Sequence, residues 1–211
     1  MMFALSERAQ DFITRTQAFI QQEIEPIEKA FWDEVHQLNV DGDWTKWQWP
    51  AQLEQLKTKA KAAGLWNMFL PDTELGAGLS VQEYAHIAEL TGRSLLAPTV
   101  FNCNAPDSGN MEVLWRYGSD EQKRQWLQPL LAGEIRSVFC MTEPAVASSD
   151  ATNMQATAVV DGDEIVLNGR KWWSSGLGDP NAKVIIFMAY TPDPNKDRHH
   201  QHSMVLVPID T

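Results

Sequence analysis

The chain has few cysteines, few basic residues and no long apolar run, and each shortage excludes a class of protein. Its 211 residues contain only two cysteines, too few for a secreted scaffold held by disulfides. Lys and Arg number 17 against 28 Asp and Glu, and the net charge of −11 argues against general nucleic-acid binding or an anionic membrane surface. No apolar run approaches a membrane span, and the first residues lack a secretory signal. We therefore expect a reduced, cytoplasmic chain with two inert thiols, Cys103 and Cys140.

Two common ligand signatures are also missing. No Gly-x-Gly-x-x-Gly stretch links a strand to a helix, and Gly76-Ala77-Gly78 is too weak to indicate a phosphate loop. A Rossmann-type nucleotide site is therefore not expected. His199, His200 and His202 lie in a polar tract with too few ligands for a metal cluster, so we predict a solvated loop there and no metal site.

Helical spacing dominates the first part of the chain. Pro26 interrupts an apolar stripe and predicts a kink or boundary, and capping boxes begin at Ser80 and Ser119. A second stripe is expected to run through Val81, Tyr84, Ala85 and Ala88. The closely spaced tryptophans predict a surface loop anchored into this helical domain by Trp44, Trp47 and Trp49, with contact to a partner as the alternative. The apolar stripe that Pro26 interrupts consists of Ile20, Ile24, Ile27 and Phe31.

After Gly133 the period becomes that of strands. Apolar alternation on both sides of Asp161-Gly162-Asp163 predicts a hairpin, and two further apolar strands follow at 183–190 and 203–209. The predicted fold class is therefore α+β. An all-helical domain over residues 1–135 precedes an antiparallel β-barrel or sandwich over residues 136–211.

The stretch from Arg136 to Asp150 begins as a strand and then turns. Pro144 fixes its own φ and moves Glu143 out of helical space, so the backbone must turn at this point. Small residues and hydroxyls follow, and the N–H groups of the turn add further donors. A donor-rich turn at a strand end suits an electron-rich heterocycle or an anionic group.

A second stretch, Asn168 to Gly176, complements the first. We expect it to form a hairpin turn followed by a strand end that carries Trp172 and Trp173, with the hydroxyls of Ser174 and Ser175 after them. One indole could lie against a planar cofactor while the hydroxyls reach its polar edge. The residues alone thus indicate a site for a large aromatic cofactor.

Met-Thr-Glu-Pro followed by Ser-Ser-Asp, and then Asn-Gly-Arg-Lys-Trp-Trp-Ser-Ser-Gly, resembles the two flavin-binding segments of the acyl-CoA dehydrogenase family. The match is closest to the subgroup that in animals is fused to a phosphotransferase-like kinase domain. Stretches at 64–71, 105–112 and 202–208 resemble the same subgroup. The resemblance therefore spans nearly the whole chain in order.

The resemblance implies FAD as cofactor, held by residues of both segments. Ser149 would also approach the acyl-CoA substrate. The chain has one more residue between Pro144 and Asp150 than the commonest family pattern, so Ser148 and Ser149 are hard to separate. After the tryptophan, two serines replace the usual β-branched residue and threonine. The implied cofactor-binding residues are Phe139, Cys140, Met141, Thr142, Ser148, Ser149, Trp173, Ser174 and Ser175.

The implied activity is α,β-dehydrogenation of an acyl-CoA thioester in fatty-acid β-oxidation. The implied partners are an electron-transfer flavoprotein as acceptor and further copies in a homodimer or homotetramer. In a eukaryote the resemblance implies a mitochondrial protein. The family's glutamate base belongs to a C-terminal helical domain, which we expect to be absent here along with the end of the β domain, so no catalytic residue is nominated. The alternative is a non-catalytic folded remnant or interaction module with weak flavin or acyl-CoA binding.

Overall fold

The computed structural model describes residues 4–211, which divide into two compact units between Gly133 and Glu134. The first unit is helical and the second is built on a sheet. This order confirms the predicted combination of a helical domain and a β domain. Each unit has its own elements and its own buried residues.

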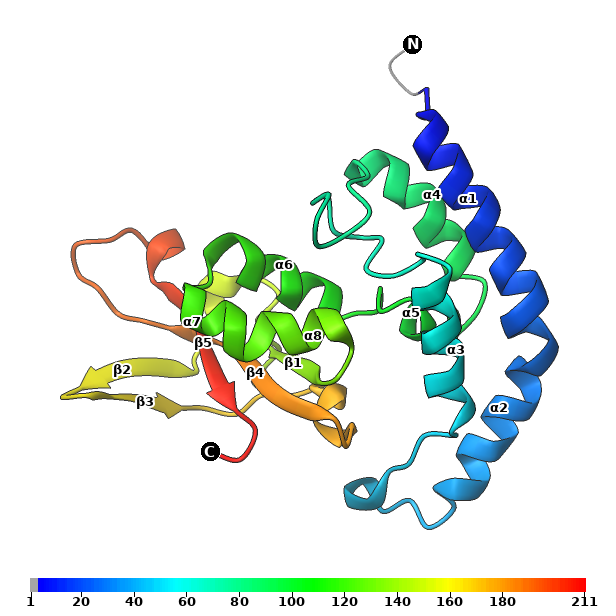
Figure 1. The fold of residues 1–211 in the computed structure, drawn as a ribbon. Helices are drawn as coiled ribbons and strands as arrows, with labels where there is room; N and C mark the ends of the chain where they lie inside the picture. Colours follow the sequence, from blue (N-terminus) through cyan, green and yellow to red (C-terminus); the bar gives the residue numbers. More distant parts are fainter. Residues whose placement is uncertain (1–3) are drawn as a thin grey trace. The chain divides into compact units, whose positions relative to one another are not determined.

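The helical unit begins with two helices that are joined end to end. They are α1 (Glu7–Phe19) and α2 (Glu25–Leu38), with one π-helical turn (Ile20–Ile24) between them. The Glu25 amide donates to the Ile20 carbonyl, five residues back, and Pro26 is the second residue of α2. Pro26 has no N–H and cannot continue an i→i−4 ladder, which favours a wider turn just before it. The predicted boundary at Pro26 is confirmed, and Figure 1 shows one long, bent rod.

Shorter helices complete the unit. The capping boxes predicted at Ser80 and Ser119 are both present, and Gly133 ends the last helix at a φ of 71°. The predicted stripe is wrong at Val81, which is 76% exposed, and at Ala85, which is also exposed. The buried apolar residue of this helix is Ile87. No helix among residues 4–211 is long and apolar enough to cross a membrane. The helices are α3 (Gln52–Ala62), α4 (Val81–Thr91), α5 (Ala97–Val100), α6 (Asp107–Tyr117), α7 (Asp120–Gln122) and α8 (Gln128–Ala132), with a second π turn (Lys123–Leu127) before α8.

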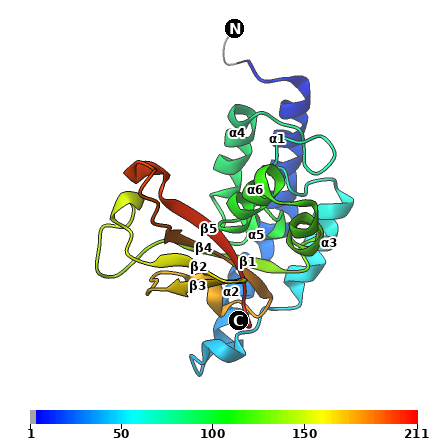
Figure 2. The ribbon, with the colours of Figure 1, turned by 90° about the vertical axis from the view of Figure 1, so that its left-hand side faces the viewer.

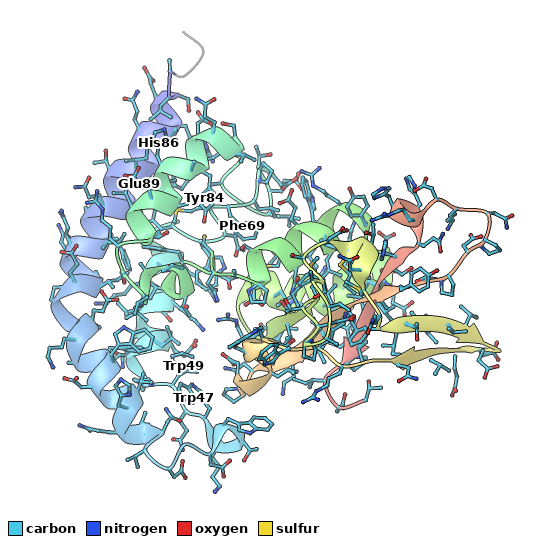
Figure 3. The ribbon with its side chains drawn as sticks, turned by 180° about the vertical axis from the view of Figure 1, so that it is seen from behind. Trp47, Trp49, Phe69, Tyr84, His86 and Glu89 are labelled. Atoms are coloured by element: carbon cyan, nitrogen blue, oxygen red, sulfur yellow. The ribbon has the colours of Figure 1, made fainter. Side chains whose placement is uncertain are left out.

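Two tryptophans of the loop after α2 pack against the core of this unit. Trp47 and Trp49 pack against the buried cluster that includes Phe31, whereas Trp44 is 64% exposed. The predicted anchoring of this loop is therefore confirmed for two of its three indoles. Figure 3 shows Trp47 and Trp49 at the opposite end of the helical unit from Glu89 of α4.

The Trp66-Asn67 motif holds the end of α8. The indole N–H of Trp66 donates to the Leu131 carbonyl at 2.7 Å, and the Asn67 side-chain amide donates to the same oxygen at 3.0 Å. The buried amide of Asn102 donates to Asn67 Oδ1 at 2.7 Å and to the Leu130 carbonyl at 2.9 Å. The last carbonyls of a helix have no partner within it, so these donors satisfy groups that would otherwise be unpaired.

The second unit is a mixed five-stranded sheet with β4 at its centre (Figure 2). β4 pairs with β1 in parallel and with β5 antiparallel, and its end reaches β2 at Tyr190. β2 and β3 form the predicted hairpin. The strands are β1 (Arg136–Cys140), β2 (Thr157–Asp161), β3 (Glu164–Asn168), β4 (Ala182–Tyr190) and β5 (His202–Pro208).

Two details of the β prediction are wrong. The sheet is not purely antiparallel, because the long connection between β1 and β4 provides the crossover that a parallel pair requires. The second segment is also not a hairpin turn leading into a strand, since Arg170–Ser174 is irregular and ends in a 3₁₀ turn at Ser175–Gly178. Gly169 is needed for close packing, because a Cβ on it would lie 2.4 Å from the Cβ of Ala156.

One carboxylate joins the first turns of α1 and α4. Ser6 and Ser80 are the N-cap residues of these helices, and Glu83 Oε1 accepts from the Ser6 hydroxyl at 2.5 Å. Glu83 Oε2 accepts from the Ser80 amide at 3.0 Å. These bonds, the Ser6 hydroxyl first, lower the pKa of Glu83 from 4.5 to about 2.

Glu83→Gln should change how stability depends on pH. A carboxyl whose pKa is lowered by folding contributes stability above pH 4.5, and this contribution is lost as the pH falls toward 2. The Glu83→Gln variant should therefore be less stable than the parent at neutral pH, and the difference should shrink across this window. Thermal unfolding at a series of pH values measures it. Glu89→Gln, an exposed change on the same helix, should follow the parent, and parallel curves for Glu83→Gln would contradict the assignment.

Candidate functional site

The two segments identified in the sequence lie side by side in the sheet unit. Thr142 follows β1, and its carbonyl accepts the backbone N–H of Trp172 at 2.8 Å. This hydrogen bond joins positions thirty residues apart in the chain. The hydroxyl of Thr142 is exposed and has no hydrogen-bond partner within residues 4–211.

A buried ion pair lies next to that hydrogen bond. Lys171 Nζ is 3.0 Å from Glu143 Oε1 and 3.1 Å from the Met141 carbonyl. The side chains of Lys171 and Glu143 are only 6% and 4% exposed. The ammonium also lies 4.9 Å from the centroid of the Phe187 ring, so both charges are held away from bulk water.

The carboxylate of Glu143 is fully engaged. It accepts the amide of Gln155 at 2.8 Å through Oε2 and the amide of Ala156 at 2.9 Å through Oε1, in addition to Lys171. Burial raises the pKa of Glu143, but these amides and the ammonium outweigh it, so the pKa lies below its ordinary value. Glu143 is therefore ionised at neutral pH, with a structural role that fits its position beside Pro144.

Three of the predicted cofactor residues turn inward. Cys140 belongs to a small core with Val138 and Ala182, and burial raises the pKa of its thiol although Ser174 and Lys171 lower it. The buried hydroxyl of Ser148 accepts the Glu143 N–H at 2.6 Å. Ser174 Oγ is buried next to the Cys140 thiol and makes no regular hydrogen bond with the described residues.

The other predicted residues are available to a ligand. Side chains alternate along a strand, so Phe139 and Met141 lie on the opposite face of the β1 segment from Cys140. The structure thus separates each pair of adjacent serines into one inward and one outward hydroxyl. The exposed members of the predicted set are Thr142, Ser149, Trp173 and Ser175.

Trp172 and Trp173 form a stacked pair with centroids 4.8 Å apart and an interplanar angle of 22°. Trp173 is 70% exposed and has a φ of 60°, in the left-handed region that bulky residues rarely adopt. Such backbone costs about 1–3 kcal/mol and is found mostly at functional sites. The left-handed residue and the adjoining ion pair were not predicted from the sequence, although an acidic residue beside the turn proline and a lysine beside the tryptophans were visible in it.

A pocket of about 480 Å³ borders the same turn. Its walls come from both segments and from the start of β2, so the turn, the hairpin and the second segment meet there. This pocket was not predicted from the sequence. The lining residues are Glu143, Pro144, Ala145, Gln155, Ala156, Thr157, Asn168, Gly169 and Arg170.

The histidine-rich tract has local partners. His200 Nδ1 lies 2.7 Å from Asp197 Oδ2, and Asp197 also accepts the His199 amide at 2.8 Å. Within residues 4–211, no group of three or more His, Cys, Asp or Glu side chains is placed to hold a metal ion. The tract forms a short 3₁₀ turn (Arg198–His200) before β5.

Family models match both units. The N-terminal domain of acyl-CoA dehydrogenases matches residues 6–134, and the middle domain of acyl-CoA dehydrogenases matches residues 138–211. The fold of both units is thus that of a known class of enzyme. The chain belongs to the acyl-CoA dehydrogenase family, as its motifs predicted.

Individual relatives agree with this assignment. Acyl-CoA dehydrogenase family member 11 of Mus musculus is 52% identical over 210 residues, which cover 100% of this chain and 26% of the relative. A solved Mycobacterium abscessus structure, described as a candidate acyl-CoA dehydrogenase, is 63% identical with a TM-score of 0.91 and covers 99% of this chain and 52% of its own. A glutaryl-CoA dehydrogenase from Mycobacterium smegmatis, solved with FADH2, is 26% identical with a TM-score of 0.67. The match covers 98% of this chain and 47% of the glutaryl-CoA dehydrogenase chain. The chain spans about a quarter of the mouse relative and half of the solved ones.

Replacing the two neighbouring serines should have unequal effects on stability. Ser148→Ala leaves the buried Glu143 N–H without its acceptor and should cost about 1–3 kcal/mol of unfolding free energy. Ser149→Ala removes an exposed hydroxyl and should change stability by less than about 0.5 kcal/mol. Urea unfolding of the two variants and the parent measures both values. A larger loss for Ser149→Ala would contradict the inward placement of Ser148.

Proposed function

We propose that this chain forms the flavin-binding part of an FAD-dependent acyl-CoA dehydrogenase. The observation that carries the proposal is the hydrogen bond from the Trp172 amide to the Thr142 carbonyl, which brings the two segments together. Family membership supports it, and the FADH2 bound to the solved glutaryl-CoA dehydrogenase supports the choice of cofactor.

The exposed residues fit the shape and chemistry of a flavin. An isoalloxazine ring is a flat apolar body with a polar pyrimidine edge, and it needs aromatic packing together with hydrogen-bond donors. The exposed indole of Trp173 provides the packing surface, and the free hydroxyls of Thr142 and Ser175 provide donors. Phe139 and Met141 add apolar contacts from one face of the β1 segment. The residues present therefore fit the group.

When bound, FAD supplies the two-electron acceptor for removal of hydrogen from the α and β carbons of an acyl-CoA thioester. The hydroxyls of Thr142 and Ser175 are the groups that would donate to the polar edge of the ring and would stabilise its reduced form. Ser149, exposed beside the turn, is the hydroxyl we assign to the acyl-CoA, and Ser148 is excluded from that role by its bond to Glu143.

The general base lies outside the turn. Abstraction of the α proton requires a carboxylate that is free to accept it and has a raised pKa. Glu143 has a lowered pKa and three donors on its oxygens, so it cannot serve. We therefore assign the base to a further helical domain of the whole protein. We assign homo-oligomer contacts and the exchange of electrons with an electron-transfer flavoprotein to the whole protein as well.

Trp173→Ala should weaken FAD binding by the 211-residue chain. We expect the chain alone to bind FAD weakly, because part of the cofactor's contacts belongs to the whole protein. An aromatic pair contributes about 0.5–1.5 kcal/mol beyond area burial, so loss of the indole should weaken binding roughly two- to tenfold. Flavin fluorescence titration of the parent, Trp173→Ala and the control Trp44→Ala measures this. Equal affinity for the parent and Trp173→Ala would contradict the assigned role of Trp173.

The activity itself is tested on a longer protein that contains this chain together with the further helical domain. The purified protein should be yellow and should reduce an artificial electron acceptor when an acyl-CoA is added. A visible absorption spectrum and an acceptor-reduction assay are sufficient. A protein that stays colourless after reconstitution with FAD would end the proposal.

A further inference from the structure

We infer that Lys171 and Glu143 form a clasp that sets the position of the Trp172–Trp173 pair relative to the Thr142 turn, so that Lys171 is a positioning residue for the flavin site. This inference deepens the proposed function and rests on it as far as the cofactor is concerned. The part that concerns the geometry of the chain stands without any ligand.

The clasp joins three separate pieces of chain. Lys171 Nζ binds the Met141 carbonyl at 3.1 Å and the Glu143 carboxylate at 3.0 Å, which ties the second segment to the first. The same carboxylate holds the amides of Gln155 and Ala156, immediately before β2. One ion pair thus fixes the turn, the entry to the hairpin and the start of the tryptophan segment.

The clasp is adjacent in sequence to the hydrogen bond that brings the segments together. Lys171 precedes Trp172, and Glu143 follows Thr142, so the ion pair and the Trp172–Thr142 bond hold consecutive residues of both segments. No strand pairing includes residues 170–174, and these two contacts take its place. Trp173, two residues from the clasp, adopts a φ of 60° that an irregular segment would not keep without support.

The chemistry of the pair favours a role in positioning over a role in overall stability. Removing two charges from water largely cancels the attraction between them, so a buried pair adds little net stability compared with uncharged residues of similar shape. Removing one partner is costly because it leaves the other charge buried and uncompensated. A pair of this kind can be retained because it selects one arrangement of the chain.

The test compares Lys171→Met, Glu143→Gln and the double variant in the 211-residue chain. Three properties are measured: the urea midpoint, the far-UV circular-dichroism couplet produced by two stacked indoles, and FAD affinity. Each single variant should lower the midpoint, weaken the couplet and reduce FAD affinity at least about tenfold. The double variant, which removes both charges, should recover most of the midpoint but neither the couplet nor the affinity.

Two controls make the readouts specific. Trp172→Phe abolishes one partner of the stack and gives the baseline for the couplet. Ile186→Val, a cavity in the buried part of β4, should lower the midpoint and leave the couplet and the FAD affinity unchanged.

The outcomes separate the two proposals. A double variant that regains the couplet together with its stability would overturn the clasp, because the pair would then be a stabilising contact only. The parent chain could show no saturable FAD binding while its couplet is still lost in Lys171→Met. That result would support the clasp and count against the flavin assignment. Single variants that keep both the couplet and the parent's affinity would also overturn the clasp.

Discussion

An ionised carboxylate removed from water must be surrounded by donors, and the turn after β1 is built around this requirement at Glu143. Its three donors come from two places in the chain: two adjacent amides before β2 and the ammonium of Lys171. Meeting the requirement forces distant parts of the chain to converge. The convergence leaves hydroxyls and an indole exposed on residues adjacent to those that are buried, so the accessible part of the site is a consequence of how the charge is buried.

Buried and exposed side chains alternate along both segments of the candidate site. Cys140, Ser148 and Ser174 fill the interior, and each lies next to a residue that remains exposed or faces the other side of its segment. Adjacent residues of the same type therefore differ in exposure. In the turn, Ser148 bonds to the Glu143 amide, whereas Ser149 remains exposed.

Much of the fold could be predicted from local signals. Capping boxes at Ser80 and Ser119 and the Asp161-Gly162-Asp163 hairpin depend on contacts within a few residues. The parallel pairing of β1 with β4 could not be predicted in the same way, because strand direction depends on a long crossover and not on the residues of either strand.

Prediction of the site had the same limit. The residue types of both segments were visible, and the family resemblance predicted a flavin-binding role for them. Which of two adjacent serines turns inward depends on where the Glu143 amide finds an acceptor, and a sequence does not show that. The Glu143–Lys171 pair spans 28 positions, so no periodicity relates its members. The left-handed Trp173 contradicts the ordinary preference of a bulky residue and follows only from its surroundings.

The π turn between α1 and α2 changes which side of these joined helices faces the core. Buried residues at 12, 16, 20 and 24 are spaced by four, and in a 3.6-residue helix each such step advances about 40° past a full turn. Over three steps the apolar stripe would rotate about 120° away from the core. The wider turn offsets part of this rotation, and Phe31 and Val35 lie in the same buried cluster as Phe12. The second π turn also stands just before a proline, Pro129.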